Sequence, residues 1–158
     1  MSEINLNSIV SAVVNEVKFR EDMTLDKARA LSKKVMAKAE EMGVKAVVAI
    51  SNRAARPVLI ECADDSFIAS YDVALNKAFT VVSLKMSTYK LKGLAQPGGS
   101  LYGIQFTNEG KIVIFGGGEP LMAANGSIIG GLGVSGGTEE QDTKLAEYGR
   151  EIFEKGEI

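Results

Sequence analysis

The sequence predicts an α+β domain in which about five antiparallel strands form a sheet flanked by helices. Strand-like runs follow one another directly at 44–51 and 57–62, and again between residues 100 and 135. The pair Asn125-Gly126 lies between two apolar runs, which is the strongest short-range signal for a β-hairpin. A doubly wound parallel sheet would alternate single strands with helices, so the sequence argues against that fold.

Two helices are predicted before the first strand. Residues 3–19 place apolar side chains at the spacing of one helix face, and we expect this helix to pack on the body or on another subunit. The second helix begins after Thr24, a favoured N-cap residue, and ends at Gly43. Residues 44–51 and 57–62 then predict two paired strands, because the link between them is short.

The middle of the chain predicts a third helix and two further strands. Residues 66–86 have helical periodicity, and 87–99 predict a short polar helix or turn. Residues 100–107 and 111–117 are strand-like runs joined through 108–110.

The end of the chain predicts a hairpin around Asn125-Gly126 and a last helix over 138–156. Thr138 and Gln141 form a T-x-x-Q capping box at the start of this helix. Because the strands after residue 100 are consecutive, the predicted sheet is antiparallel.

Composition bounds the class of protein. The 158 residues suit one domain with one core, and the formal net charge of −2 with scattered basic residues gives no footprint for nucleic acid. The single Cys62 excludes an internal disulfide and fits a reducing compartment. We find no signal peptide and no apolar run long enough for a membrane span, so we expect a cytoplasmic protein without membrane contact. We expect residues 1–21 to be a helical extension and 22–158 to be a single domain.

The absence of histidine is the most informative feature of the composition. It excludes Ser-His-Asp and Cys-His catalytic sets and histidine-based metal sites. We identify no catalytic residues and no metal-ligating set in the sequence.

Five glycines lie between Gly130 and Gly137, directly before the helix that begins at Thr138. One interpretation is an anion site, formed by backbone N–H groups of Ser135, Gly136, Gly137 and Thr138 at the positive end of that helix. The alternative is a tight strand-to-helix turn with close strand packing. The phosphate-loop pattern is absent because no Gly-Lys-[Ser/Thr] follows the glycines.

Four other residues have both a binding and a structural interpretation. Gly117 and Gly118 form either a backbone-lined cavity wall or a bulge between strands. Lys77 either reaches a ligand's carboxylate or phosphate, or is solvated as most helix lysines are. Tyr71 either covers a planar ligand or belongs to the core.

Three segments together resemble a known family. They are "TLDKARALSKKVMAKAEEMG", "ASYDVALNKAFTVV" and "GGGEPLMAANGSIIGGLGVSGGTEEQD", and they resemble the GlcG/HbpS family, which includes the C-terminal domain of PduO-type proteins. The resemblance covers about residues 22–155. It implies a profilin-like or PAS-like domain with a five-stranded antiparallel sheet. It also implies a homo-oligomer, and a link to haem, to corrinoids or to diol- and glycolate-utilisation pathways.

Two features depart from the family pattern. The Asp-x-x-Gly turn that usually follows the first strand is replaced by a link that contains Arg53 and Arg56. The histidine that binds haem iron in some members cannot exist here, so haem would take Tyr, Met, Cys or Lys as axial ligand, or no protein ligand.

These observations favour a non-catalytic binding protein for a small anionic molecule or a haem- or corrinoid-type tetrapyrrole. In this hypothesis Lys77 and the glycine N–H groups hold the anionic end, and Tyr71 supplies contact area. One alternative is an accessory enzyme of diol, glycerol or hydroxy-acid utilisation that uses Lys77. Another is a purely structural subunit of an assembly.

Overall fold

The computed structural model describes residues 5–18 and 22–158. In these residues four strands form one antiparallel sheet in the order β2-β1-β4-β3. The elements are α1 (Leu6–Lys18), α2 (Leu25–Glu41), β1 (Val47–Asn52), β2 (Pro57–Cys62), α3 (Ile68–Leu84), α4 (Thr88–Ala95), η1 (Ile104–Phe106), η2 (Asn108–Gly110), β3 (Gly118–Met122), β4 (Ile128–Ser135) and α5 (Glu139–Glu154). The α+β class and the antiparallel sheet are confirmed, but the predicted fifth strand is wrong.

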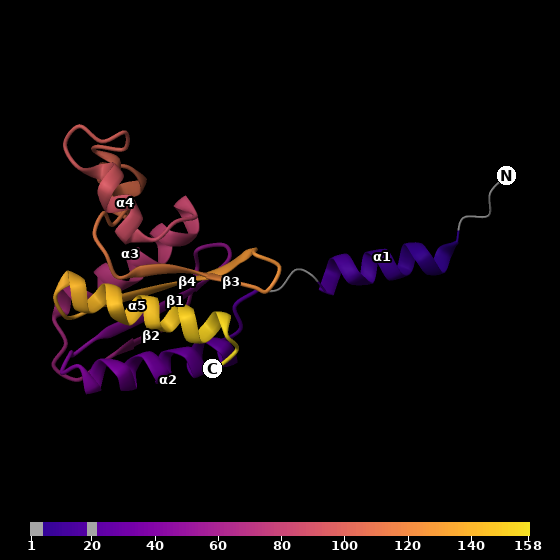
Figure 1. Cartoon of the computed structure of the whole chain (residues 1–158), viewed down its shortest axis with the longest axis horizontal. Coiled ribbons are helices and arrows are strands. Elements are labelled where there is room, and N and C mark those ends of the chain that lie inside the picture. Colours follow the sequence, from indigo (N-terminus) through magenta and orange to yellow (C-terminus); the bar gives the residue numbers. More distant parts are fainter. Residues whose placement is uncertain (1–4, 19–21) are drawn as a thin grey trace.

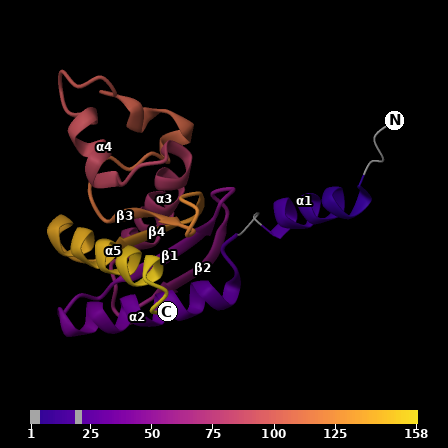
Figure 2. The same cartoon turned by 45° about the vertical axis from the view of Figure 1, so that its right-hand side comes forward.

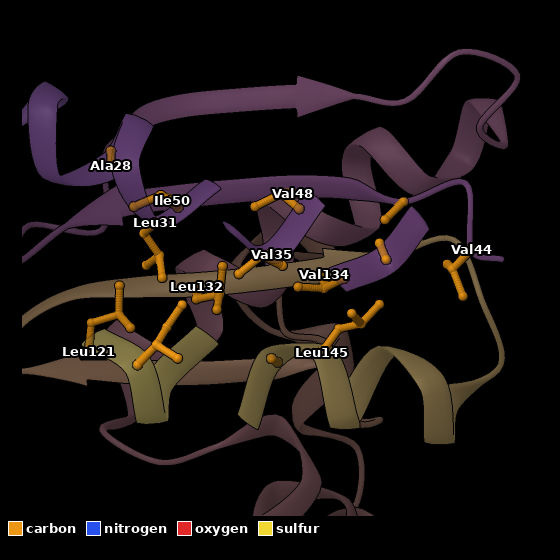
Figure 3. Close-up of a cluster of buried hydrophobic side chains, with 14 of the residues drawn as sticks. Ala28, Leu31, Val35, Val44, Val48, Ile50, Leu121, Leu132, Val134 and Leu145 are labelled. Atoms are coloured by element: carbon orange, nitrogen blue, oxygen red, sulfur yellow. The ribbon is translucent and has the colours of Figure 1, made fainter. Parts of the chain in front are cut away.

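The sheet lies between two layers of helices. Figure 1 shows α2 and α5 below the sheet and α3 with α4 above it. The main core lies on the α2 and α5 side (Figure 3), where apolar side chains of both helices meet those of three strands. Its labelled members are Ala28, Leu31, Val35, Val44, Val48, Ile50, Leu121, Leu132, Val134 and Leu145.

On the opposite face α3 lies directly on the two central strands. Val47 and Ala49 of β1 pack against Ala74 and Ala78 of α3. The helix comes close because β4 carries glycine at the facing positions: a Cβ at Gly133 would overlap the Ala74 carbonyl oxygen. Part of the glycine-rich run therefore lets the backbone of α3 approach β4 closely.

The strands predicted at 100–107 and 111–117 are absent. Residues Leu101–Thr107 form turns and η1, held by local hydrogen bonds such as Ile104 N–H to the Leu101 carbonyl. Left-handed backbone at Gly103, Asn108 and Glu109 prevents an extended chain. Beyond it, the Val113 N–H donates to Thr80 Oγ1 of α3, so this segment is held by a helix and not by a strand.

The helix boundaries agree with the capping signals. Thr24 Oγ1 accepts from the Lys27 N–H, and the capping box of Thr138 and Gln141 is complete. Gly43 takes the left-handed conformation after α2 (φ 70°).

Helix α1 stands apart from the layered body in both views (Figures 1 and 2). Residues 3, 4 and 19 of the predicted helix 3–19 lie outside the described residues. Residues 1, 2, 20 and 21 of the predicted 1–21 extension also lie outside them. Leu6, Ile9, Val10 and Val13 are between 50% and 72% exposed, so the body does not cover these four side chains.

Candidate ligand-binding site

Lys77 is fully buried on the inner face of α3, which is unusual for a lysine. Its Nζ donates to the Val134 carbonyl oxygen of β4 (2.7 Å) and to Asp142 Oδ2 of α5 (3.0 Å). The Phe115 ring covers the amine, with its centroid 5.0 Å from Nζ. The ion pair thus joins a helix above the sheet, the sheet itself and a helix below it.

The predicted glycine Gly117 makes room for this amine. Its backbone is left-handed (φ 108°), and a Cβ there would lie 2.6 Å from Lys77 Nζ. The Gly117 carbonyl oxygen accepts from the Val134 N–H. Gly117 is therefore required by both its conformation and the close approach of Lys77.

Side chains of the same chain occupy the N–H groups of both glycine loops. Gly137 N–H donates to Asp142 Oδ1 (2.9 Å), and Thr138 N–H donates to Gln141 Oε1 (2.9 Å). In the other loop, Gly116 N–H donates to Glu139 Oε1 (3.0 Å) and Gly118 N–H to Thr88 Oγ1 (2.9 Å). A ligand anion at these N–H groups would replace carboxylate, amide or hydroxyl oxygens already bonded there.

Burial acts on both members of the ion pair. Desolvation lowers the pKa of Lys77, while the charge of Asp142 opposes that change. Desolvation likewise raises the pKa of Asp142, against the opposing effects of Lys77 and of the Gly137 N–H. The pair is stable because each charge has its partner and hydrogen bonds within the fold.

The structure brings most of the predicted site residues together. Gly117, Gly118 and Gly137 lie around the ion pair that Lys77 forms with Asp142. Ser135 is the last residue of β4 and Gly136 follows it. Ser135 Oγ donates to Ser70 Oγ, and a Cβ at Gly136 would meet the Lys45 carbonyl oxygen. Thr138 follows as the N-cap of α5.

Tyr71 lies elsewhere, on the outward side of α3, and is 45% exposed. Its six-residue separation from Lys77 puts the two side chains on different faces of the helix. Ligand binding by Tyr71 and by the residues around Lys77 stays a prediction.

Sequence reasoning missed Asp142 and Phe115. Asp142 shares the helix face of Leu145, Ala146 and Gly149, at the spacing i, i+3, i+4 and i+7, and all four residues are buried. An acid on an apolar stripe predicts a buried partner, and this was the available signal. Nothing in the sequence places Phe115 over Lys77.

The described residues form several surface grooves large enough for small molecules, among them one beside β2 and one beside α4. The first, which we call the Cys62 groove, has a volume of about 610 Å³ between α2 and β2. It is lined by Arg29, Lys33, Met36, Glu61 and Cys62. The second, the α4–α5 groove, has a volume of about 380 Å³ and is lined by Tyr89, Lys92, Glu139, Glu140, Thr143, Lys144 and Glu147.

The two grooves differ in charge. The Cys62 groove combines two basic side chains with one acid. The α4–α5 groove carries three acids, and its lysines are already paired: Lys92 with Glu139 and Lys144 with Glu140, each at 2.7 Å. An anionic ligand is therefore attracted more strongly to the Cys62 groove.

The described residues contain no group of three or more histidine, cysteine, aspartate or glutamate side chains that could hold a metal ion. No helix in the described part of the chain is both long and apolar enough to cross a bilayer.

The fold and these grooves define a small α+β domain that presents ligand-sized surfaces beside its sheet. The model of the family described as "Haem degrading protein HbpS-like" matches residues 23–151, and the chain belongs to this family, as its sequence predicts.

Two curated relatives are similar to this chain. The "Uncharacterized 15.0 kDa protein in dhaT-dhaS intergenic region" of Citrobacter freundii is 44% identical over 131 residues, which are 83% of this chain and 92% of the relative. Corrinoid adenosyltransferase PduO of the same organism is 38% identical over 117 residues, or 74% of this chain. The match spans 35% of PduO, about a third of its length.

Two solved structures share the fold. Klebsiella pneumoniae protein ORFY has a TM-score of 0.80 and 43% identity, with 83% of this chain and 90% of that chain covered. The PduOC:heme complex has a TM-score of 0.78 and 32% identity, with 83% and 94% covered.

Proposed function

We propose that this protein is a non-catalytic tetrapyrrole-binding protein that acts as a homo-oligomer in small-molecule catabolism in the cytoplasm. The observation that carries the proposal is the haem complex of PduOC, which shares the fold at a TM-score of 0.78 and 32% identity. The resemblance to PduO, named a corrinoid adenosyltransferase, supports a corrinoid as the other ligand of this class.

The residues of the Cys62 groove fit a haem. Without histidine, the axial ligands that remain include thioether sulfur, which Met36 brings to this groove. Cys62 lines the groove as a residue, but it lies opposite Val47 in the sheet, so its thiol is on the face that packs against α3. Arg29 and Lys33 supply the charge that propionate carboxylates need. Bound haem would supply iron that changes oxidation state, while the groove residues hold and orient the macrocycle.

An exposed apolar patch supports self-association. Phe67, Ile68 and Tyr71, at the start of α3, are 72%, 96% and 45% exposed. Neighbouring apolar side chains exposed to this degree are typical of a protein interface. We propose that a second copy of the chain covers this patch.

The alternative use of Lys77 as a reactive amine has less support. Its amine is enclosed by Asp142, the Val134 carbonyl and the Phe115 ring, so a carbonyl substrate has no approach without an opening of the fold. An enclosed and paired lysine favours a structural role over covalent catalysis.

The test is a titration of the intact apoprotein with hemin, followed by its Soret absorbance. We expect saturation at about one hemin per chain, and at least tenfold weaker binding, about 1.4 kcal/mol, after Met36→Leu or after Arg29→Gln with Lys33→Gln. Lys144→Gln, in the other groove, is the matched control and leaves binding unchanged. Hydroxocobalamin as competitor distinguishes a corrinoid site from a haem site.

Three outcomes would overturn parts of the proposal. No saturable change with either tetrapyrrole ends it. Loss of the Soret band with release of iron would show turnover and end the non-catalytic assignment. Weakened binding in Lys77→Met with Asp142→Asn, but not in the variants of Met36, Arg29 and Lys33, would place the ligand at the glycine loops instead.

A further inference from the structure

Glu61 is the acid that lines the Cys62 groove, and a buried hydroxyl fixes its position. β2 is an edge strand of the sheet, and α2 lies beneath it (Figure 2). Glu61 pairs with Val48 in the sheet, and Val48 belongs to the core that α2 and α5 cover, so Glu61 is on the face that α2 covers. There the fully buried Ser32 of α2 donates from Oγ to Glu61 Oε2.

This hydrogen bond ties the acid to one orientation. A serine inside a helix commonly donates to the backbone carbonyl four residues earlier, whereas Ser32 donates to a side chain of a neighbouring strand. A hydroxyl has a single proton, so Ser32 fixes Oε2 of Glu61 and leaves Oε1 with its lone pairs. No other described residue donates to Glu61. Its Oε1 is therefore ready to accept a hydrogen bond from a ligand.

The lining of the groove is mixed in charge once the hollow beside it is included. The Cys62 groove shares Lys33 and Met36 with a hollow of about 440 Å³ between the end of α2 and the start of β1. The charged side chains of the joint lining are Arg29, Lys33 and Lys45 with Glu40, Glu61 and Asp64. None of these six forms an ion pair with another described residue. The lining thus offers separate donors and acceptors, and it is not a purely basic surface.

The two tetrapyrrole classes of the proposed function differ at the rim of the ring. A haem presents propionate carboxylates, which accept hydrogen bonds and are repelled by a glutamate. A corrinoid presents amide side chains, which donate from nitrogen and accept at oxygen. An amide N–H can donate to Glu61 while Arg29 or Lys33 donates to an amide oxygen. A haem would satisfy the two bases and leave the acid unpaired, so the groove discriminates against it.

We propose that Glu61 determines the specificity of the Cys62 groove, which favours an amide-bearing corrinoid over a haem, and that Ser32 is the positioning residue that holds its carboxylate. The proposal rests on the proposed function, which places a tetrapyrrole in this groove. Without the Ser32 hydroxyl, Glu61 would be free to turn toward Arg29 or Lys33. The groove would then lose an acceptor and a donor together.

The test is titration of the intact chain with metal-free protoporphyrin IX and with dicyanocobinamide in excess cyanide, each followed by its absorbance. Neither probe takes an axial ligand from the protein, so the ratio of the two Kd values reports the rim alone. We expect the parent to bind dicyanocobinamide more tightly. Glu61→Gln keeps the shape and removes the charge, so it should shift the ratio toward protoporphyrin IX by about tenfold. Glu140→Gln, in the α4–α5 groove, is the matched control and should leave the ratio unchanged.

A double-variant comparison tests the role of Ser32. Ser32→Ala should shift the ratio in the same direction as Glu61→Gln, and adding it to Glu61→Gln should cause no further shift, because Ser32 acts through Glu61. A serine with a purely structural role would lower the stability of the fold and leave the ratio where it is in the parent. That result would overturn the positioning role.

The outcomes separate the preference from the proposed function. An equal change of both Kd values in Glu61→Gln, or tighter binding of protoporphyrin IX by the parent, would overturn the preference and leave the proposed function standing. So would a parent that saturates with hemin but binds neither probe. If hemin fails to saturate the parent and neither probe binds, the proposed function falls and the preference falls with it.

Discussion

Two opposite charges sit inside this protein at Lys77 and Asp142, and their surroundings explain why the fold tolerates them. Lys77 is fully buried and Asp142 is 3% exposed. Each charge alone would cost several kcal/mol to bury, and the cost is offset only while the partner and its hydrogen bonds are present. The pair therefore fixes the relative position of α3, β4 and α5.

Replacing one member of the Lys77–Asp142 pair should lower the free energy of unfolding much more than replacing both. We expect Lys77→Met to lower the free energy of unfolding by about 3–5 kcal/mol, because Asp142 stays buried without its counter-charge. Adding Asp142→Asn should recover at least half of that loss, since the amide oxygen still accepts from the Gly137 N–H. Urea denaturation at pH 7 measures both values. Equal losses in the single and double variants would contradict a coupled ion pair.

Glu119 is a second buried charge, and it is less well compensated. It lies in β3 at 8% exposure, with Arg150 Nε 3.2 Å from Oε2 and with Glu147 and Glu154 facing it from α5. Burial raises the pKa of Glu119 from 4.5 to about 7, against the opposing charge of Arg150. Between these values the folded protein holds a proton that the unfolded chain has released.

The free energy of unfolding should therefore fall as the pH rises from 4.5 to 7, by at most about 3 kcal/mol from this one group. Glu119→Gln removes the titrating carboxyl, so the variant should gain stability relative to the parent as the pH rises from 5 to 8. Urea denaturation at four pH values in this range measures the difference. Glu140→Gln replaces an exposed acid and is the control, because its stability relative to the parent should not rise with pH in this way. A constant difference between parent and Glu119→Gln at every pH would contradict the raised pKa.

At the scale of elements, the sequence predicted best what is decided locally. The capping box at Thr138, the N-cap at Thr24 and the stop at Gly43 all depend on residues within one helical turn, and all three are present. The turn at Asn125-Gly126 joins β3 and β4 as predicted. Each of these signals is sufficient without knowledge of the rest of the chain.

The strands predicted at 100–107 and 111–117 failed because strand formation depends on a partner. Their apolar residues have strand propensity, but that propensity mainly reflects burial against neighbours. Here Ile112 and Val113 are buried outside any strand, and Thr80 of α3 supplies a hydrogen bond to the Val113 N–H that a strand would otherwise give. The sequence predicted apolar character correctly and could not show that a helix would satisfy it.

The sequence predicted the glycine loops of the candidate site and Lys77, but not the side chains that contact Lys77. Glycine at 117 and 137 indicated two loops with close backbone approach, and both lie beside Lys77. Asp142, 65 positions along the chain from Lys77, completes the site through tertiary folding. The sequence did not predict the Cys62 groove, because α2 and β2 become neighbours only when the chain folds.

At the scale of the whole molecule, the body has buried cores on both faces of its sheet and an exposed apolar patch at Phe67, Ile68 and Tyr71. The sheet is sealed by α2 and α5 on one side and by α3 on the other. Phe67 and Ile68 point away from both layers at 72% and 96% exposure, so they contribute little to the stability of a single chain. The proposed contact between two copies of the chain would account for their apolar character.

This explanation predicts that Ile68→Asp will reduce the mass of the assembly in solution without unfolding the chain. An almost fully exposed side chain changes the stability of a monomer by no more than about 0.5 kcal/mol when substituted, so the denaturation midpoint of the dissociated chain should be preserved. Asp72→Asn, at another exposed position of the same helix, is the control that keeps the parent mass. Light scattering across a concentration series measures the mass. An unchanged mass of the assembly in Ile68→Asp would mean that the copies touch elsewhere. The patch of Phe67, Ile68 and Tyr71 would then need a different partner.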